Sequence, residues 1–358
     1  MIKFNEIYTT NQEIEMITDA ISRGSLIGDT YYHIKVKEIL DKYYNKSYLV
    51  HTCTAALEIA ALAIDIQPGD EVIMPSYTFV STANAFVLRG AKIIFVDVDE
   101  HMMIDVDRVK QAISDKTKAI VPVHYGGSLC DMKALKKLCK EGIYLIEDAA
   151  QSIFNTDIET YSDFSCISLH STKNITSGGE GGILVVNNKS LDEKVSMIIE
   201  KGTNRFAFQN KEVEKYTWKT LGSSYSMDGT RCAFLYAQLL KWEQIISKRQ
   251  KLVRLYQKQL SIFDIFKQEK HNGHLFYIKT KDKQERELLQ QYLYDNGIES
   301  VSHYEPLHLS DAGKVYGEFI GKNNYTKDAS RLLRLPVHGN MTEDNIYYIC
   351  EKVKAFYE

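Results

Sequence analysis

Apolar and polar positions alternate in blocks through the first half of the chain. Short apolar runs bounded by polar or turn residues predict strands at 71–75, 92–97, 118–123 and 143–147. Between these runs, apolar residues spaced as in helices predict helices at 80–89, 105–114 and 131–140. Strands that alternate with helices are typical of a parallel sheet covered on both faces.

The pattern continues on either side of this block. Further strands are expected near 164–169 and 183–187, before and after a glycine-rich loop. Helical spacing is also found at 11–23, 33–45 and 54–64.

The last third of the chain has fewer strand signals. One long helix is expected over 231–261, then a strand at 274–279 and helices at 284–296 and 342–357. We therefore predict an α/β protein with a mostly parallel central sheet between helices. The large domain is expected to span 1–245, and a smaller α+β C-terminal domain 246–358.

Composition narrows the class of protein. Among 358 residues, 44% are hydrophobic and 25% charged, which is ordinary for a globular protein. A net charge of −3 gives no general attraction to nucleic acid or to an anionic membrane, so neither is an expected partner. No signal peptide, no apolar run of about 18 residues and no C-x-x-C or metal-type spacing is visible. We expect a cytoplasmic protein with reduced thiols and no metal.

A lysine stands at an unusual place in the second half of the sheet. Lys173 lies in 168–174 (SLHSTKN), between an apolar run and the glycine-rich segment 178–182. Glycines allow a close approach of backbone to a ligand. A lone lysine at the end of a strand is nevertheless more often an exposed surface residue.

Three other motifs stand at the ends of strands, where ligands bind in parallel sheets; the segment 51–56 is also interpreted as a strand end that opens onto a helix. Asp148 in 147–151 (EDAAQ) could pair with a protonated ring nitrogen, or could only cap a helix. Thr54 and its neighbours in 51–56 (HTCTAA) open a helix whose N–H groups suit a phosphate, or again only cap it. An aromatic residue in 75–80 (PSYTFV) could stack on a planar ring, although most such residues belong to the core. Together the four motifs supply what a pyridoxal-phosphate (PLP) site needs.

In this order the motifs resemble the DegT/StrS-type sugar-nucleotide aminotransferases, which are fold-type I PLP enzymes. The likeness runs from about residue 20 to the C-terminus. Within the family, the longest shared stretches resemble the transaminases that form dTDP-4-amino-4,6-dideoxygalactose, at 66–93, 117–125, 147–151, 200–205, 215–218 and 222–225.

The resemblance implies a role for each matching residue. Lys173 matches the lysine that binds the cofactor covalently and moves the proton, and Asp148 matches the partner of the ring nitrogen. Gln151 matches the group near the ring's phenolic oxygen, and Phe79 the aromatic that stacks on the ring. The implied phosphate ligands are Ser168, Cys53 and Thr54.

The sequence departs from the family pattern at three positions. A common G-Y-N motif, whose asparagine reaches the phosphate of the partner subunit, reads Gly222-Ser223-Ser224 here, so Ser224 is the implied contact in a homodimer. Cys53 replaces a glycine or serine, and no nearby base supports it as a nucleophile. Arg231 stands where many members have glutamine, and the sequence offers no physical reason.

The resemblance also implies the reaction. L-Glutamate is the expected amino donor, with 2-oxoglutarate as the product and pyridoxamine phosphate (PMP) as the intermediate form of the cofactor. The expected acceptor is a dTDP-linked 4-keto-6-deoxyhexose aminated at C4, for a surface glycan. Amination at C3 of a dTDP-linked 3-keto-6-deoxyhexose is the alternative, because a pocket can hold a sugar in either orientation.

Sugar-side residues are harder to choose. Asp29, Tyr304 and His308 are the candidates, although each could simply pack a loop; Arg205 and His338 are further candidates. A non-catalytic binding or regulatory protein would not need the lysine, the acid and the phosphate site together. A related dehydratase lacks the lysine, and a dinucleotide-binding dehydrogenase needs a G-x-G-x-x-G after its first strand, which segment 178–182 does not provide.

Overall fold

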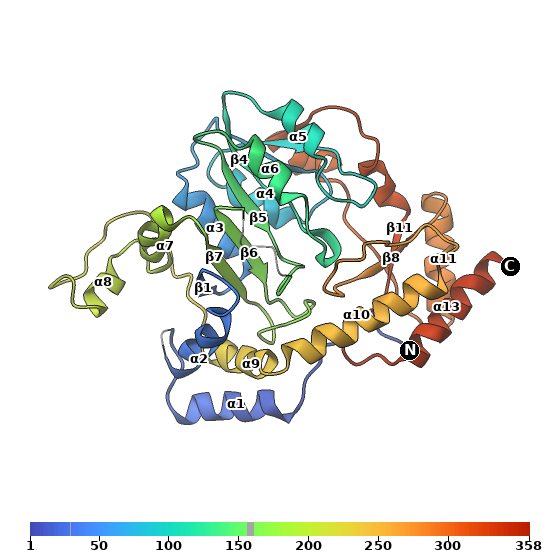
Figure 1. Ribbon diagram of the computed structural model, residues 1–358, viewed down its shortest axis with the longest axis horizontal. Helices are drawn as coiled ribbons and strands as arrows, with labels where there is room; N and C mark the ends of the chain where they lie inside the picture. The colour runs from blue at the N-terminus through green and yellow to red at the C-terminus, as the bar shows by residue number, and fades with distance from the viewer. Residues whose placement is uncertain (29, 156–160) are drawn as a thin grey trace.

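The computed structural model describes residues 1–28, 30–155 and 161–358. Within these residues the centre is an eight-stranded sheet in the order β1-β7-β6-β5-β4-β2-β3-β10 (Figure 1). Its strands are β1 Lys46–Val50, β2 Glu71–Pro75, β3 Lys92–Val96, β4 Thr117–Ile120, β5 Tyr144–Asp148, β6 Phe164–Ser168, β7 Gly182–Val186 and β10 Gly317–Phe319. The expected mostly parallel sheet is confirmed, since only β7 runs antiparallel to its neighbours, β6 and β1.

The reversal at β7 decides where the strand ends meet. Because β7 is antiparallel to both β6 and β1, strand β1 runs in the same direction as β6. The C-terminal ends of β1, β2, β5 and β6 therefore lie at one edge of the sheet. This edge is where ligands bind in parallel sheets.

Helices cover both faces of the sheet. Those before the C-terminal unit are α1 Asn11–Ser22, α2 Tyr31–Leu40, α3 Cys53–Ala63, α4 Val80–Val87, α5 Val106–Ala112, α6 Met132–Leu138, α7 Asp192–Ile199, α8 Arg205–Gln209 and α9 Gly229–Leu239. Along β2, Val72 and Met74 pack with α3, α4 and α7, whereas Ile73 packs on the opposite face with α5 and α6. This alternation is that of a strand buried on both faces. Helices α2 and α9 cover the β1–β7 end.

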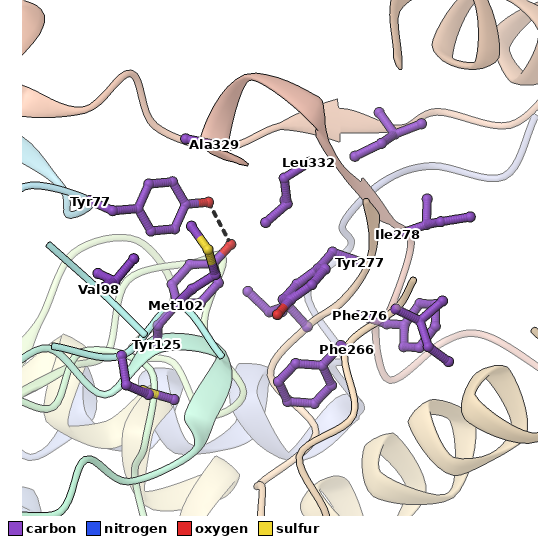
Figure 2. Packing of buried hydrophobic residues seen from close by; sticks show 14 of the residues in the cluster. Tyr77, Val98, Met102, Tyr125, Phe266, Phe276, Tyr277, Ile278, Ala329 and Leu332 are labelled. Atoms are coloured by element: carbon purple, nitrogen blue, oxygen red, sulfur yellow. Dashed lines mark hydrogen bonds between the residues drawn. The ribbon is translucent and has the colours of Figure 1, made fainter. Parts of the chain in front are cut away.

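The C-terminal unit packs beside the large sheet. It contains α10 Trp242–Gln259, α11 Lys283–Asp295, α12 Asp311–Tyr316, α13 Glu343–Tyr357 and a three-stranded antiparallel sheet of β8 Phe276–Lys279, β11 Leu332–Leu335 and β9 Val301–Ser302. One hydrophobic cluster joins the two parts, with Tyr77 and Tyr125 on one side and Phe276, Tyr277 and Leu332 on the other (Figure 2). The short strand β10 leaves this unit to pair with β3. The division at residue 245 stays a prediction.

Two predicted helices differ from those observed. The helix expected over 33–45 is α2, which ends at Leu40. The single helix expected over 231–261 is wrong: α9 ends at Leu239, and α10 begins at Trp242 after Lys241, whose φ is −130°. The Lys241 ammonium is buried and lies 2.5 Å from the Glu13 carboxylate of α1. The break thus accompanies a tertiary contact, and the local sequence contains no proline or glycine to announce it.

No helix in the described ranges is both long and apolar enough to cross a membrane.

Candidate active site

A cavity of about 350 Å³ lies at the edge of the large sheet where β1, β2, β5 and β6 end. Its walls come from the loops after these strands, from the N-terminal segment and from the C-terminal unit. The structure brings together eight of the predicted site residues in this wall, namely Cys53, Thr54, Phe79, Asp148, Gln151, Ser168, Lys173 and Tyr304.

Asp148 is the last residue of β5 and is 5% exposed. Its Oδ2 accepts a hydrogen bond from Thr82 Oγ1 at 2.7 Å, and its Oδ1 accepts one from the backbone N–H of Ala150 at 3.1 Å. Burial raises the pKa of this carboxyl, although the two hydrogen bonds and the charge of Lys173 act in the opposite direction. The carboxylate is therefore held in one orientation with a buried charge that a bound cation would compensate.

Lys173 lies five positions after the end of β6, in the loop that returns to β7. Its backbone N–H donates to the carbonyl of His170 at 2.9 Å. Burial lowers the pKa of its amine, and the charge of Arg334 lowers it further, whereas Cys53 and Asp148 raise it. A lowered pKa increases the share of neutral amine near pH 7, and only the neutral amine attacks a carbonyl or accepts a proton. Lys173 is half-buried and lines the cavity, so it is not the exposed surface lysine of the simpler interpretation.

The first turn of α3 also faces the cavity. Thr52 is the N-cap, and its hydroxyl accepts the backbone N–H three residues on, at 2.9 Å. Cys53 and Thr54 occupy the first two helical positions, where N–H groups have no partner within the helix. The Thr54 hydroxyl donates to Ser81 Oγ at 2.8 Å, and Ser168 ends β6 in the same wall. A helix start with hydroxyl groups around it can hold a phosphate.

Phe79 and Cys53 contribute different groups to this wall. Phe79 caps α4, is 54% exposed, and its ring centroid lies 6.1 Å from that of Tyr304. The Cys53 thiol donates to the carbonyl of Cys166 at 3.4 Å. Burial raises the pKa of this thiol well above its usual range. A protonated thiol is a poor nucleophile, which supports the expectation that Cys53 does not attack a substrate.

The amide of Gln151 is oriented by the main chain. Its Oε1 accepts the N–H of Gly126 at 2.8 Å, and its Nε2 donates to Tyr304 Oη at 3.3 Å. Gly126 has a φ of 72°, a left-handed conformation that glycine adopts without strain. Because the backbone N–H must face an oxygen, the amide NH₂ is the end left for the cavity. Gln151 therefore offers a donor, which suits an oxygen on a bound ring.

The other predicted residues lie elsewhere. His308 does not line the cavity: its Nδ1 lies 2.6 Å from Ser76 Oγ, and its ring lies 4.4 Å from that of Phe319. Ser224 is exposed and pairs with Glu200 in an isolated antiparallel bridge. Asp29 lies outside the described residues. The roles assigned to these three residues stay predictions.

Arg231 makes two polar contacts that the sequence alone did not reveal. On α9, its Nε lies 3.3 Å from the carboxylate of Asp228, and one terminal nitrogen donates to the carbonyl of His51 at 3.4 Å. It therefore ties the start of α9 to the loop before α3. Arg205 and His338 do not line the cavity.

Apart from Tyr304, the residues of the C-terminal unit that line the cavity were not predicted from the sequence. Arg334 of β11 and His303, which follows β9, both line the cavity. Arg334 is 9% exposed and stands in an otherwise apolar strand, 332–335 (LLRL). The sequence of this strand could have indicated a site residue, because a charged residue in a buried strand needs a partner or a ligand. Phe4 of the N-terminal segment places its ring 4.7 Å from the Arg334 guanidinium.

The model of the DegT/DnrJ/EryC1/StrS aminotransferase family matches residues 8–354. The chain belongs to this family. A relative named GDP-perosamine synthase, from Escherichia coli O157:H7, is 33% identical over 316 residues, which cover 85% of this chain and 84% of that protein.

Solved structures share the fold. A putative sugar aminotransferase from Streptococcus pneumoniae, in its PMP form, has a TM-score of 0.90 at 24% identity, with 99% of each chain covered. NtdA from Bacillus subtilis, solved with bound cofactor PMP, has a TM-score of 0.85 at 26% identity, with 96% of this chain and 83% of that chain covered.

These comparisons confirm the expected fold class and a sugar aminotransferase as the class of enzyme. They also confirm the expected cofactor, PLP, which the family's solved structures carry as PLP or PMP. The cavity fits this cofactor, since it combines a buried carboxylate, a lysine of lowered pKa and an open helix start. The special resemblance to dTDP-4-amino-4,6-dideoxygalactose transaminases is not confirmed, because the relative described above carries the name of a GDP-sugar enzyme.

Proposed function

We propose that this sugar aminotransferase transfers the amino group of L-glutamate to C4 of a dTDP-linked 4-keto-6-deoxyhexose. The products are 2-oxoglutarate and a 4-amino-4,6-dideoxy sugar nucleotide for a surface glycan. The observation that carries the proposal is the convergence of Lys173, Asp148 and the start of α3 on one cavity.

Each of these groups has a task in the transfer. Bound PLP supplies an electron sink for the pair left when the amino-bearing carbon loses its proton. Lys173 holds the cofactor and, when released, moves that proton as base and then as acid. Asp148 keeps the ring nitrogen protonated, and the Gln151 amide donates to the ring's oxygen. The first turn of α3, with Thr54 and Ser168, binds the phosphate.

The nucleotide and the position of amination are the open features of the acceptor. A GDP-linked keto sugar is the second candidate, favoured by the 33% identity to the relative named GDP-perosamine synthase. Amination at C3 of a dTDP-linked 3-keto sugar uses the same lysine and acid, so the cofactor half of the cavity does not separate it from C4.

One set of parallel reactions tests the proposal. Purified holoenzyme and L-glutamate are incubated with dTDP-4-keto-6-deoxyglucose, with its 3-keto isomer, or with GDP-4-keto-6-deoxymannose. NMR of the product then shows which carbon carries the amine and in which configuration. We expect amination at C4 of the dTDP sugar. Exclusive turnover of another acceptor replaces the assigned substrate, and a lack of 2-oxoglutarate with every acceptor refutes the proposed reaction.

A homodimer in the cytoplasm is also part of the proposal, with Ser224 contacting the partner subunit's cofactor. In support, the arm that carries α8 projects from the body of the molecule (Figure 1). The residues that follow α8 also expose large apolar side chains. Trp218 is 76% exposed, Leu221 55% and Tyr216 48%. Such a projection is unfavourable in water unless another surface covers it. All six cysteines are free thiols, as in a reducing compartment.

Light scattering after gel filtration tests the dimer. We expect twice the chain mass for the wild type and a shift toward the monomer for Trp218→Ser. Tyr294→Ser is the matched control, because Tyr294 is also an exposed aromatic residue but lies on α11 in the C-terminal unit, away from the arm. A wild type that is monomeric at micromolar concentration contradicts the proposal.

A further inference from the structure

Arg334 is a buried cation with an unused hydrogen-bond donor. It is 9% exposed, lies between two leucines on β11 and lines the cavity. Its Nε is buried and has no hydrogen-bond partner among the residues that the structure describes. Among the described residues no carboxylate lies within ion-pair distance of its guanidinium. A buried guanidinium without an anion is costly, so the arrangement requires another source of negative charge.

A chain of neutral groups orients this guanidinium. One terminal nitrogen of Arg334 donates to His303 Nε2, and His303 Nδ1 lies 3.0 Å from Tyr125 Oη. The Tyr125 hydroxyl in turn bonds that of Tyr77 at 2.9 Å (Figure 2). Because arginine can only donate, His303 Nε2 must accept, and the ring is neutral with its proton on Nδ1. Burial, then the charge of Arg334, lowers the pKa of His303. The chain positions the arginine without neutralising it.

A second buried arginine in the same wall shows the contrast. Arg249 is 3% exposed, and its Nε and one terminal nitrogen donate to the carbonyls of Gly273 and His274 at 3.0 and 2.8 Å. The Arg249 donors are thus used to hold the backbone of the C-terminal unit. The Nε of Arg334 remains for a ligand.

We propose that Arg334 binds the α-carboxylate of the amino donor. The inference rests on the proposed function, in which L-glutamate is that donor. A guanidinium matches a carboxylate with parallel N–H donors. Arg334 and Lys173 line the same cavity, so an anion bound to Arg334 lies in the cavity into which the amine of Lys173 reaches. A keto sugar has no anionic group next to its carbonyl carbon, so the arginine serves the donor and not the acceptor.

The two half-reactions separate this role from a structural one. Arg334→Gln and Arg334→Lys are prepared as holoenzymes and mixed with L-glutamate. The conversion of bound PLP to PMP is then followed by the loss of the yellow colour of the PLP form. We expect the second-order rate constant to fall by about 10- to 100-fold in Arg334→Gln, with a smaller loss in Arg334→Lys, because a bond between charged groups is removed. The reverse test loads each variant with PMP and adds the keto sugar. Here we expect a change of less than about threefold.

Matched reagents assign the carboxylate and control for folding. Arg331→Gln removes a guanidinium from the segment just before β11, where it pairs with Asp328 and Asp264, and should leave both half-reactions unchanged. L-2-Aminobutanoate keeps the α-carboxylate but lacks the distal one, so Arg334→Gln should slow it by a similar factor.

Several outcomes of these experiments would contradict the role proposed for Arg334. Equal losses in both half-reactions, or an unchanged rate with L-glutamate, overturn the inference. A loss with L-glutamate but none with L-2-aminobutanoate moves the contact to the distal carboxylate and overturns the α-carboxylate assignment. A wild-type holoenzyme that L-glutamate does not convert contradicts the proposed function and this inference with it.

Discussion

The two walls of the cavity are built in different ways. On the sheet side, Asp148, Thr54 and Lys173 stand at strand ends or in the first turn of a helix. Backbone groups close in sequence hold Asp148 and Lys173, and side chains of the large domain add bonds to Asp148 and Thr54. On the C-terminal side, the guanidinium of Arg334 is oriented by contacts with other side chains. The links from Arg334 to His303 and from His303 to Tyr125 join residues 31 and 178 positions apart.

This difference has a physical consequence. The sheet side presents a negative charge and open N–H groups to a cofactor that carries a protonated ring and a phosphate. The other side presents an arginine whose charge no described carboxylate balances. We therefore expect the cofactor side of the cavity, at the edge of the sheet, to keep its geometry when residues of the C-terminal unit are changed. The side that carries Arg334, in contrast, depends on how the C-terminal unit packs. Four substitutions test this contrast, from the largest expected effect to the smallest.

Replacing Lys173 by alanine removes both the amine that holds the cofactor and the group that moves the proton. We expect turnover to fall by about 10⁴-fold or more. The measurement is 2-oxoglutarate formed with a saturating keto sugar, and exposed Lys189→Ala is the control. A Lys173→Ala variant with near-wild-type turnover would rule out the assigned site.

Asp148→Asn tests the buried charge on the sheet side. Because burial raises the pKa of Asp148 in the folded protein, its ionisation costs stability. The cost is absent below the pKa of the unfolded state, grows as the pH rises, and is complete above the raised pKa of the folded state. At pH 7.5, cofactor-free Asp148→Asn should unfold at the same temperature as cofactor-free wild type or a few degrees higher, and the difference should shrink as the pH falls. Its affinity for PLP should drop by about 100-fold. Thermal unfolding with and without PLP measures both effects, and a cofactor-free variant less stable than wild type contradicts the account.

Tyr125→Phe tests the series of hydrogen-bonded side chains that orients Arg334 on the C-terminal side of the cavity. The change leaves His303 Nδ1 and the Tyr77 hydroxyl without their buried partner, which should lower the free energy of unfolding by about 1–3 kcal/mol. The half-reaction with L-glutamate should slow by about 3- to 10-fold because Arg334 is less well oriented. Tyr77→Phe is the matched variant: it keeps the bond between Tyr125 and His303, so both effects should be smaller. Equal effects of the two variants would show that the chain does not position Arg334.

His308→Ala should have the smallest effect on activity. His308 bonds Ser76 and packs on Phe319 outside the cavity, so we expect a loss of about 1 kcal/mol in stability. The KM for the nucleotide sugar should change by less than about twofold. An increase of tenfold or more at unchanged stability would restore the predicted substrate contact.

Much of the sheet could be predicted because its signals are local. The apolar runs at 71–75 and 143–147 became β2 and β5, and the helices between the strands lie where their spacing predicted them. The break between α9 and α10 could not be predicted, because no proline or glycine stands there and the break accompanies a contact with α1 that only the tertiary structure shows. The strand β10 was also missed, since three residues carry no readable period.

The sequence alone determined the fold class and the cofactor. The reason is that Asp148, Ser168, Lys173 and the start of α3 belong to contiguous motifs at strand ends, and parallel strands bring such ends to one edge. Only the tertiary structure decided which residues complete the cavity. It placed Tyr304 in the wall, His308 outside it, and Arg334 in the wall of the same cavity as Lys173. These positions depend on how the C-terminal unit packs against the sheet, through contacts between residues far apart in the chain that no local pattern records.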